Sequence, residues 1–343
     1  MAVQSADASP RDRRNRGLTV AFEGPTVSVV IPVYNQAQYL PMAIRSVLDQ
    51  DYRPLEVIVL DDGSTDAIGE AVAPFLDRIT YVRQENRGAA NALNEGIARA
   101  TGELVCWLSA DDRYLPGKLR AQVEAFGANA DLALVCTGYE VVDSRDRVIR
   151  RQPAPRWPHP DPFIAVFWRN PINGSTVMLR RDVFDAAGGF DETLRADVDA
   201  DMWLRIAMNR RIRQVDGVFV RYRIHASSLS ANRLLMRESM TRVRARAIAE
   251  GTLMNRLRAS NPATTSRLLA LMSAEYAIRG LRDLAFDLYR ASRSGGGTSI
   301  AQPLARFMLV LTRWTGGRRL AVAVAGPTRR RLWRMRETMR RSR

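Results

Sequence analysis

The stretch VSVVIPVYNQAQYLPMAIRSVLDQDYRPLEVIVLDDGSTD, residues 27–66 of this 343-residue chain, decides the fold. It contains two apolar, β-branched runs, at 27–31 and 55–60, and a polar, turn-forming cluster follows each of them. Between the runs, Pro41 stands in the first turn of a segment with helical apolar spacing. This strand–helix–strand order predicts parallel strands of an α/β sheet, joined by a right-handed crossover.

The same alternation continues along the chain. The expected strands are 79–83, 104–108, 132–136, 139–142 and 176–180, and the expected helices are 67–76, 89–100, 181–187 and 199–209. A Pro-rich segment at 152–162 is expected to be a loop. The fold class that follows is α/β, with a mainly parallel, Rossmann-like sheet flanked by helices and a C-terminal helical extension.

Composition divides the chain into four predicted parts. Residues 1–25 are polar and charged without periodicity, which is typical of a disordered tail. Residues 26–233 carry the α/β pattern and form the expected main domain. Residues 234–293 have a helical pattern rich in Ala, Arg and Leu, and residues 294–343 form a basic, amphipathic tail.

The positive charge is concentrated near the C-terminus. The chain has a net charge of +16, and residues 301–343 contain twelve arginines and one acidic residue, a net charge of +11. Such a segment predicts a polyanionic neighbour, either an anionic membrane surface or nucleic acid. Binding of nucleic acid through this segment is therefore one candidate function, and it is kept below as the alternative. Against it, aromatic residues are not interleaved with the basic ones, and no RNA-binding motif occurs.

Two interpretations of the tail stay open at this point. Leu332, Met335 and Met339 fall on one helical face among arginines, as in helices that lie on a membrane surface. The same residues would also suit packing onto the helical region before them.

The compartment is expected to be the cytoplasm. The N-terminus lacks the apolar core of a secretory signal, and no uncharged apolar run reaches the roughly 18 residues of a membrane span. Cys106 and Cys136 lie in apolar runs without disulfide or metal spacing, as small core residues do. The protein is then either free in the cytoplasm or peripheral on the inner face of the membrane.

Polar clusters follow three predicted strands: IPVYNQ (31–36), LDDGSTD (60–66) and LSADD (108–112). Ligands of open parallel sheets bind beyond the carboxyl ends of the strands. The Asp and Ser residues here would also serve as helix N-caps and turn formers, but a cap needs only one carboxylate. The adjacent pairs at 61–62 and 111–112 favour a site for hydroxyl groups or for Mg²⁺ or Mn²⁺, which bind hard oxygen ligands and bridge to phosphates.

Five blocks resemble the family 2 glycosyltransferases, which are nucleotide-diphospho-sugar enzymes of the GT-A fold. The blocks are residues 27–66, 85–119, 173–194, 197–207 and 222–230, in the order that the family has them. The resemblance implies an inverting, hexosyltransferase-type enzyme that moves a sugar from a nucleotide-diphospho-sugar donor to an acceptor hydroxyl. The implied acceptor is a glycan or a lipid-linked molecule, in cell-surface polysaccharide or glycolipid synthesis.

The resemblance also implies which residues bind the donor. An apolar slot for the base comes from the first block, and Asp61 or Asp62 hydrogen-bonds the edge of the base. The implied donor-binding residues are Pro32, Val33, Tyr34, Asn35, Asp61, Asp62, Asn86, Gly88, Asn94, Ala110, Asp111 and His225. Asn86, Gly88 and Asn94 would equally belong to an ordinary loop and helix start, and a single histidine such as His225 is often structural. Arg221 and Arg223 either serve the leaving group or are ordinary surface residues.

The LSADD block corresponds to the metal motif of the family. Ser109 stands where the first Asp of that motif is common, so the resemblance puts the Mn²⁺ or Mg²⁺ on Asp111. Asp112 is either a second ligand of the metal or an acceptor for a sugar hydroxyl.

The catalytic base is expected in DVDADMWLRIA, residues 197–207. By resemblance it is Asp199, with Asp201 as the second choice. The alternative is that Asp197 and Asp199 cap the following helix. An aspartate with the ordinary pKa of about 3.9 is unprotonated at pH 7 and can accept a hydroxyl proton.

Overall fold

A computed structural model describes residues 22–127, 129, 131–154, 157–257, 262–279, 281–294, 302 and 305. Residues 1–21 of the expected N-terminal tail, and all of the basic tail except residues 294, 302 and 305, lie outside the described residues. The chain forms two compact units that interleave along the sequence. Unit 1 is residues 1–154, 174–186 and 212–223, and unit 2 is residues 155–173, 187–211 and 224–343. The four-part division expected from composition stays a prediction.

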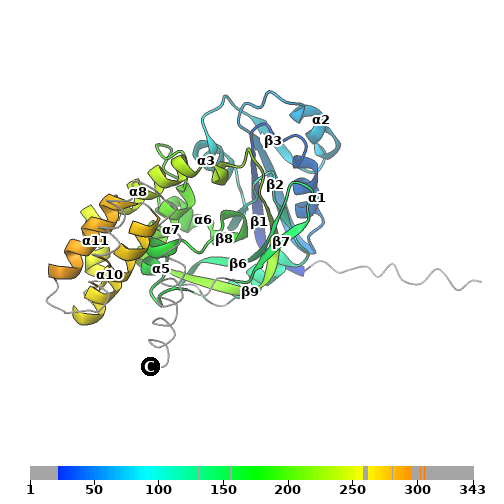
Figure 1. Ribbon diagram of the computed structural model, residues 1–343. Coiled ribbons are helices and arrows are strands. Elements are labelled where there is room, and N and C mark those ends of the chain that lie inside the picture. The colour runs from blue at the N-terminus through cyan, green and yellow to red at the C-terminus, as the bar shows by residue number, and fades with distance from the viewer. Residues whose placement is uncertain are drawn as a thin grey trace, which may run out of the picture. The chain divides into compact units, whose positions relative to one another are not determined.

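The parallel part of the sheet lies in unit 1 and follows the pattern that the sequence predicts. Strands β1 (Phe22–Val33), β2 (Tyr52–Asp61), β3 (Thr80–Arg83) and β4 (Leu104–Trp107) are arranged in the order β3-β2-β1-β4. Figure 1 labels the first three of these neighbours, β3, β2 and β1. The pairings among the four strands are all parallel. The carboxyl ends of β1, β2 and β3 are level, because Asp61 pairs with both Val33 and Arg83.

Antiparallel strands extend this sheet beyond β4. Strand β8 (Val177–Arg180) pairs with β4 and with β6 (Leu132–Val142), which also pairs with β7 (Val148–Gln152). Strand β9 (Arg211–Arg223) pairs with the short β5 (Arg113–Tyr114).

The sequence prediction divided β6 into two strands and missed β5, β7 and β9. In β9 the sequence is RIRQVDGVFVRYR, and only three of its residues are buried. A strand of this kind needs no continuous apolar run, so its composition does not distinguish it from a loop. The α/β fold with a mainly parallel sheet and flanking helices is nevertheless confirmed.

The central strand β1 is buried on both faces. Val27, Val29 and Ile31 belong to a core cluster that includes apolar residues of helices α1 (Leu40–Leu48) and α4 (Lys118–Phe126). Val30 points to the other face, towards helix α3 (Ala89–Ala98). A Cβ at Gly96 of α3 would lie 2.4 Å from Val30 Cγ1, so this helix packs closely on the strand only because residue 96 is glycine.

Two other helices complete unit 1. The helix expected at 67–76 is shorter, since α2 (Ile68–Val72) passes into a 3₁₀ turn (Ala73–Phe75) that contains Pro74. Proline cannot donate the hydrogen bond that would continue the α-helix. Helix α6 (Arg181–Ala186) follows β8 as predicted. The two cysteines, Cys106 in β4 and Cys136 in β6, are free and fully buried.

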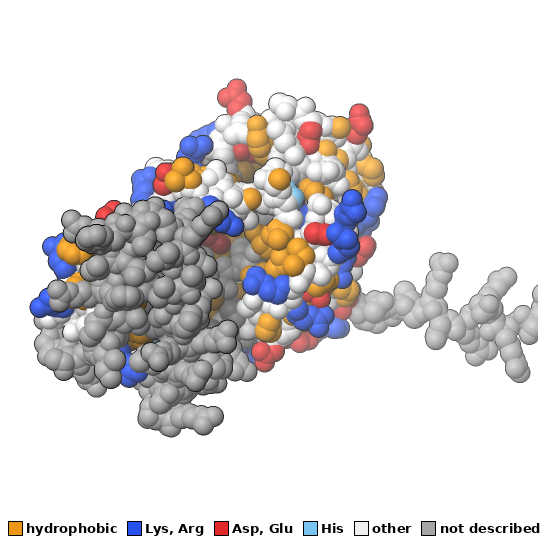
Figure 2. Space-filling view, viewed as in Figure 1, with side chains coloured by type: hydrophobic (Ala, Val, Ile, Leu, Met, Phe, Trp, Pro, Cys, Tyr) orange, Lys and Arg blue, Asp and Glu red, His pale blue; other side chains and the backbone are white. Residues whose placement is uncertain are grey.

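Unit 2 is helical. Its helices are α5 (Pro162–Arg169), α7 (Val198–Asn209), α8 (Arg233–Ala249), α9 (Thr252–Leu257), α10 (Pro262–Ile278) and α11 (Arg282–Ser294). The predicted C-terminal helical extension is thus confirmed. None of the helices in the described residues is long and apolar enough to cross a bilayer. On the face seen in Figure 2, basic and acidic side chains lie interspersed over the described residues.

Candidate functional site

The polar loops after the parallel strands meet at one edge of the sheet, as predicted. The backbone N–H of Asp62 donates to the carbonyl of Val33 (2.9 Å), and that of Gln84 donates to the carbonyl of Asp61 (2.9 Å). On the other side of β1, the N–H of Leu108 donates to the carbonyl of Val30 (2.9 Å). The loops that follow β1, β2, β3 and β4 are therefore neighbours.

Asp61 is fully buried at the end of β2 and holds its surroundings together. One carboxylate oxygen accepts the backbone N–H of Ser64 at 2.8 Å. The other accepts the Tyr81 hydroxyl and the Arg83 guanidinium, both at 2.8 Å. Three hydrogen bonds from the chain favour a supporting role for this carboxylate over a direct contact with a base.

Asp62 holds the loop after β3, residues 84–88, by hydrogen bonds to its carboxylate. Its carboxylate accepts the Gln84 amide (2.8 Å) and the backbone N–H groups of Arg87 (2.9 Å) and Gly88 (2.8 Å). The Gln84 amide also donates to Asn91 of α3 at 2.8 Å. The segment 84–88 is therefore held to the end of β2 by a buried carboxylate, and Asp62 too has its partners within the chain.

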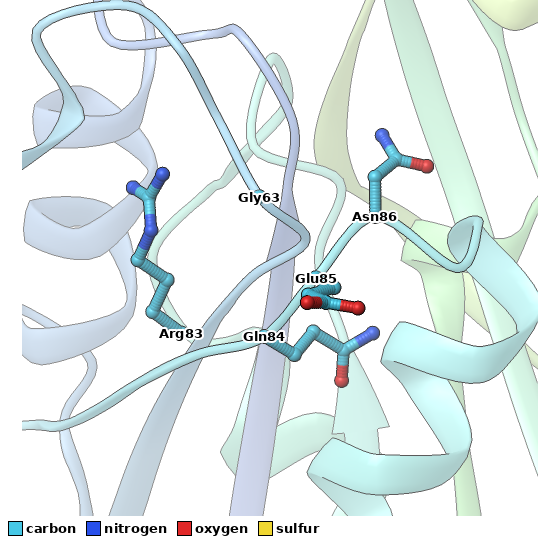
Figure 3. A pocket seen from close by; sticks show the side chains of 5 residues that line it. All are labelled: Gly63, Arg83, Gln84, Glu85 and Asn86. Carbon is cyan, nitrogen blue, oxygen red and sulfur yellow. The ribbon is translucent and has the colours of Figure 1, made fainter.

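An open pocket of about 500 Å³ lies over these two loops, lined by Gly63, Arg83, Gln84, Glu85 and Asn86. In Figure 3 the side chain of Gln84 extends towards α3, whereas that of Arg83 extends the other way. Glu85 and Asn86 are exposed at the pocket. Gly63 has a φ of +78°, and a Cβ there would lie 2.8 Å from the backbone nitrogen of Asn86. The pocket wall thus requires glycine at position 63.

The loop after β1 is joined to the same edge. Val33 is buried and Pro32 half-buried, while Tyr34 exposes 49% of its surface. Asn35 adopts a left-handed conformation (φ 53°), and its side-chain oxygen accepts the backbone N–H of Thr65 at 2.7 Å. An exposed aromatic ring beside an apolar strand end has the character expected of a surface for a planar base.

Two further predicted residues lie on or beside α3. Gly88 precedes the helix with a φ of +91°, and its N–H is used by Asp62. Asn94 is in the helix and half-buried. The structure brings Gly88 to the loops described above and leaves the role of Asn94 a prediction.

The LSADD segment is fixed by contacts with distant parts of unit 1. Asp112 is buried, and its two carboxylate oxygens accept the backbone N–H of Arg223 (2.8 Å) and the hydroxyl of Ser175 (2.6 Å). Burial, together with the neighbouring charge of Asp111, raises the pKa of Asp112 well above its usual range. Ala110 is buried next to them. These contacts favour Asp112 as the anchor of the loop and Asp111 as its functional carboxylate.

The buried side chain of Arg223 completes this anchor. Its Nε donates to the carbonyl of Asp111 (2.9 Å), and its terminal nitrogens donate to the carbonyl of Asp143 (2.8 Å) and the carboxylate of Asp146 (2.9 Å). The guanidinium also lies 5.0 Å from the centre of the Tyr39 ring. Arg223 therefore joins the loop after β4 to the turn between β6 and β7.

Asp146 is the acidic centre of that turn. Besides Arg223 it binds Arg113 (2.5 Å) and Arg221 (2.6 Å), and Arg221 also contacts Glu140 at 3.0 Å. These pairs lower the pKa of the Asp146 carboxyl despite its partial burial. Arg221 and Arg223 thus have acidic partners within unit 1, which favours a structural role over binding a leaving group.

In unit 2, Asp199 lies in the first turn of α7 and is half-buried. Its carboxylate accepts the N–H of Ala200 at 2.8 Å. Two causes raise the pKa of Asp199 to about 7: burial of the carboxyl group, which is the larger, and the negative charge of Asp197. The ordinary pKa assumed from the sequence therefore does not apply. The side chain of Asp197 makes no capping hydrogen bond, so the capping alternative does not hold for that residue.

Asp201 is buried in an ion-pair network, also in unit 2. One carboxylate oxygen accepts Nε (3.0 Å) and Nη2 (2.8 Å) of Arg205, and the other pairs with Arg246. Arg205 also donates to the carbonyl of Gly189 at 2.7 Å. Because two arginines occupy both oxygens, the geometry favours Asp199 over Asp201 as a proton acceptor.

His225 is half-buried at the start of the segment after β9. Its Nδ1 lies 2.9 Å from the hydroxyl of Ser227, and its backbone N–H donates to Ser228 at 3.1 Å. These contacts are local, and a role towards a diphosphate stays a prediction.

Residues 28–188 match the family described as Glycosyl transferase family 2. Over these residues the chain is similar to the family 2 glycosyltransferases. An uncharacterized glycosyltransferase of Rickettsia prowazekii is 35% identical over 208 residues, which are 59% of this chain and 65% of the relative. One of Rickettsia typhi is 34% identical over 206 residues, 59% of this chain and 64% of the relative. The chain thus spans slightly less than two thirds of these relatives.

Solved structures confirm the GT-A fold. The mannosyltransferase PcManGT from Pyrobaculum calidifontis, in complex with GDP-Man and Mn²⁺, matches with a TM-score of 0.55 and 21% identity over 92% of this chain and 83% of that chain. TarS 1–349 of S. aureus, in complex with UDP-GlcNAc, matches with a TM-score of 0.53 and 18% identity over 79% of this chain and 91% of that chain. At these identities the likeness concerns the fold.

Unit 1 offers few side chains for a metal ion at the LSADD segment. Among the described residues, no group of three or more His, Cys, Asp or Glu side chains is arranged to hold one. Asp112 already accepts hydrogen bonds from Arg223 and Ser175, and Asp111 is the other carboxylate of the segment. Mg²⁺ and Mn²⁺ are commonly bound by one or two carboxylates together with substrate phosphates. The residues therefore fit a cation that arrives with a diphosphate, rather than one held by the protein alone.

Sequence reasoning missed several residues that support the candidate site, and it gave Arg223 other roles. Ser175 stands inside a quoted block, but its partner Asp112 is 63 residues away. For Arg223 the sequence suggests only a leaving-group or surface role, whereas its backbone N–H donates to Asp112, 111 residues away. Tyr81 and Gln84 occupy ordinary strand-end positions and carry no signal in the sequence.

Proposed function

We propose that the protein transfers a sugar from a nucleotide-diphospho-sugar to an acceptor hydroxyl, with inversion at the anomeric carbon and with Asp199 as the general base. One observation carries the choice of base. Of the carboxylates at the start of α7, Asp197 and Asp201 are ion-paired with arginines, whereas the hydrogen bond described for Asp199 comes from a backbone N–H. A carboxylate with a pKa near 7 is suited to general base catalysis at neutral pH.

The donor is assigned to the carboxyl edge of the parallel strands. The pocket at Gly63 and Asn86, together with the exposed ring of Tyr34, would receive the nucleoside. The complexes of PcManGT with GDP-Man and of TarS with UDP-GlcNAc support a nucleotide-sugar as donor. Asp111 would hold Mn²⁺ or Mg²⁺, which supplies positive charge that stabilises the departing diphosphate.

The chain's own residues perform the remaining steps. Asp199 takes the proton from the acceptor hydroxyl, and the hydroxyl oxygen forms a bond to the anomeric carbon. The bond from that carbon to the diphosphate oxygen breaks, and its electron pair leaves with the diphosphate. Asp62 and Arg223 keep the loops of the donor site in place through the hydrogen bonds described above.

The acceptor and the cellular role are proposed more broadly. A glycan or a lipid-linked acceptor in cell-surface polysaccharide or glycolipid synthesis would suit the family. Peripheral attachment to an anionic membrane would depend on residues 301–343, of which the structure describes only 302 and 305. The nucleic-acid alternative rests on the same residues, and nothing in the described part of the chain adds to it.

The test pairs a binding assay with a transfer assay. A panel of nucleotide-sugars with Mn²⁺ is screened for thermal stabilisation, and the stabilising donors are then used in transfer assays. Asp199→Asn should bind such donors like the wild type but lose transfer by roughly 10²–10⁴-fold. Asp283→Asn is the matched control, because Asp283 is an exposed aspartate in the first turn of α11 and should keep full activity. Substantial transfer by Asp199→Asn would show that the base is another residue.

A further inference from the structure

A fully buried arginine lies behind the start of helix α7. Arg244 of α8 exposes 1% of its surface. Its Nε donates to the carbonyl of Phe167 (2.9 Å) in α5 and to the hydroxyl of Tyr276 (3.1 Å) in α10. Its Nη1 donates to the carboxylate of Asp197 at 3.0 Å. One side chain thus joins α5, α8 and α10 to the residue before α7, all within unit 2.

Asp197 has an unusual backbone for an aspartate that begins a helix. Its φ of 55° and ψ of 23° are left-handed, and its carboxylate accepts no capping hydrogen bond from the backbone N–H groups of α7. A non-glycine residue in this region is strained, and this conformation persists where the surroundings hold it. The Arg244 ion pair holds the side chain, while the backbone carbonyl of Asp197 accepts the N–H of Asp201 (3.4 Å).

We propose that Asp197 and Arg244 form a positioning pair for Asp199: the ion pair fixes where α7 begins, two residues before the base, and Arg244 offsets the negative charge of Asp197 beside it. The inference rests on the proposed role of Asp199. Arg244 lies beyond residues 28–188, which match the family, and it belongs to the helical extension. The extension would then contribute to the chemistry of the enzyme as well as to its stability.

The charges around the base support this assignment. The negative charge of Asp197 raises the pKa of Asp199, and the positive charge of Arg244 lowers it. Burial raises the pKa of Asp197 itself, while Arg244 and Arg279 lower it. The other charged or titratable groups of the elements around this pair are as follows: Asp201 and Arg205 on α7, Asp191 before it, Arg169 on α5, Arg246 on α8, Glu275 and Tyr276 on α10, and Arg279 directly after α10. At the far end of α7, Arg256 of α9 donates to the carbonyl of Ala207 and pairs with Asp161.

The first experiment measures the ionisation of Asp199 without any substrate. Aspartate carboxyl groups labelled with ¹³C are titrated by NMR, and the signal that disappears in Asp199→Asn identifies Asp199. In Asp197→Asn, which removes the adjacent negative charge, we expect the pKa of Asp199 to fall by about one unit. A structural role alone would leave it unchanged, and an unchanged value in the folded variant would overturn the inference.

A second variant tests positioning and covers the case in which Asp197→Asn does not fold. Arg244→Lys keeps the charge but cannot reach Asp197, Phe167 and Tyr276 together. We expect the pKa of Asp199 to stay near 7 and the transfer rate, with GDP-mannose and UDP-GlcNAc assayed as donors, to fall about tenfold. A rate equal to that of the wild type would overturn the positioning role.

The experiments distinguish a failure of the proposed base, Asp199, from a failure of the proposed positioning pair, Asp197 and Arg244. If Asp199→Asn retains transfer, the proposed base is wrong, whatever the titration shows. If Asp199→Asn is inactive but neither Asp197→Asn nor Arg244→Lys has its expected effect, the base stands and only the positioning pair is wrong.

Discussion

The side chain of Arg223 donates to the backbone carbonyl of Asp111 at 2.9 Å, across 112 positions of the chain. The backbone N–H of Arg223 also donates to the carboxylate of Asp112 at 2.8 Å. The carboxylate proposed to hold the metal therefore depends for its position on the last residue of β9. The matched family region, residues 28–188, does not include that strand.

Arg223→Gln should destabilise unit 1. The substitution removes a buried cation from the carbonyls of Asp111 and Asp143 and from Asp146, and such losses cost about 3 kcal/mol in the free energy of unfolding. Urea denaturation measures the change. The control is Arg147→Gln: that guanidinium is 72% exposed and pairs with Asp143, so its loss should cost at most about 1 kcal/mol. Equal effects of the two substitutions would contradict the anchoring role of Arg223.

Asp111→Asn and Asp112→Asn should separate metal binding from loop anchoring. Asp111→Asn should abolish the Mn²⁺-dependent part of the stabilisation by UDP or GDP, because it removes the proposed ligand. Asp112→Asn should instead cost roughly 1–3 kcal/mol without any ligand, because an amide cannot accept from both Arg223 and Ser175. Thermal unfolding with and without Mn²⁺ and nucleotide measures both effects. The reverse pattern would exchange the two assignments.

Gly63→Ala should damage the pocket at the end of β2. The new methyl group would lie 2.8 Å from the backbone nitrogen of Asn86, at a φ of +78°. We expect a loss of roughly 1–3 kcal/mol in stability and weaker binding of UDP and GDP. In Gly69→Ala the methyl group of α2 meets nothing within 4 Å, so stability should stay the same or rise by about 0.5–1 kcal/mol. Calorimetric titration with each nucleotide checks the binding, and unchanged affinity in Gly63→Ala would argue against this pocket.

Transfer should depend on pH through Asp199. Its pKa of about 7 means that the base is active above neutrality, so kcat/KM should rise with pH and fall about tenfold from its plateau by pH 6. Because the folded pKa exceeds the unfolded value of about 3.9, the native state binds the extra proton between these values. Asp199 therefore costs stability as pH rises from about 4 to 7. Asp199→Asn should remove that cost, and a flat rate profile between pH 6 and 8 would contradict the assignment.

Lys118, the single lysine of the chain, should destabilise the fold at neutral pH. It is fully buried, donates to Gln122 at 2.6 Å and lies 4.0 Å from the centre of the Tyr114 ring. Burial lowers its pKa to about 8. The unfolded chain, with a lysine pKa of about 10.4, binds the extra proton between these values, so the wild type gains stability as pH rises through this range. Lys118→Met should therefore be more favourable relative to the wild type at pH 7 than at pH 10, and urea unfolding at both values measures the difference.

Much of the domain could be predicted from local pattern. The strands β1, β2, β3 and β4 carry apolar or β-branched runs, and polar turn residues follow them, so the edge that collects Asp61, Asp62 and Asp111 was predictable. Strand β9 was not, because most of its residues are partly exposed and its arginines interrupt any apolar run. Helix α5 was missed because it follows the Pro-rich loop directly, with Asp161 as its N-cap.

The roles of the paired carboxylates could not be predicted in the same way. Adjacent aspartates look equivalent in the sequence, yet Asp112 is held by Arg223 and Ser175, and Asp61 by Ser64, Tyr81 and Arg83. These partners come from other strands and loops. Which carboxylate of a pair anchors its loop is therefore a consequence of packing.

By itself, the sequence determined the α/β architecture, the edge of the sheet where polar groups gather, and the short segments that contain the candidate residues. Periodicity and turn chemistry are local, so they can be read along the chain. Only the tertiary structure decided which aspartates are bound to arginines and which has a pKa near 7, as Asp199 does. Burial and the distance between charges set those properties, and both exist only after distant segments have folded together.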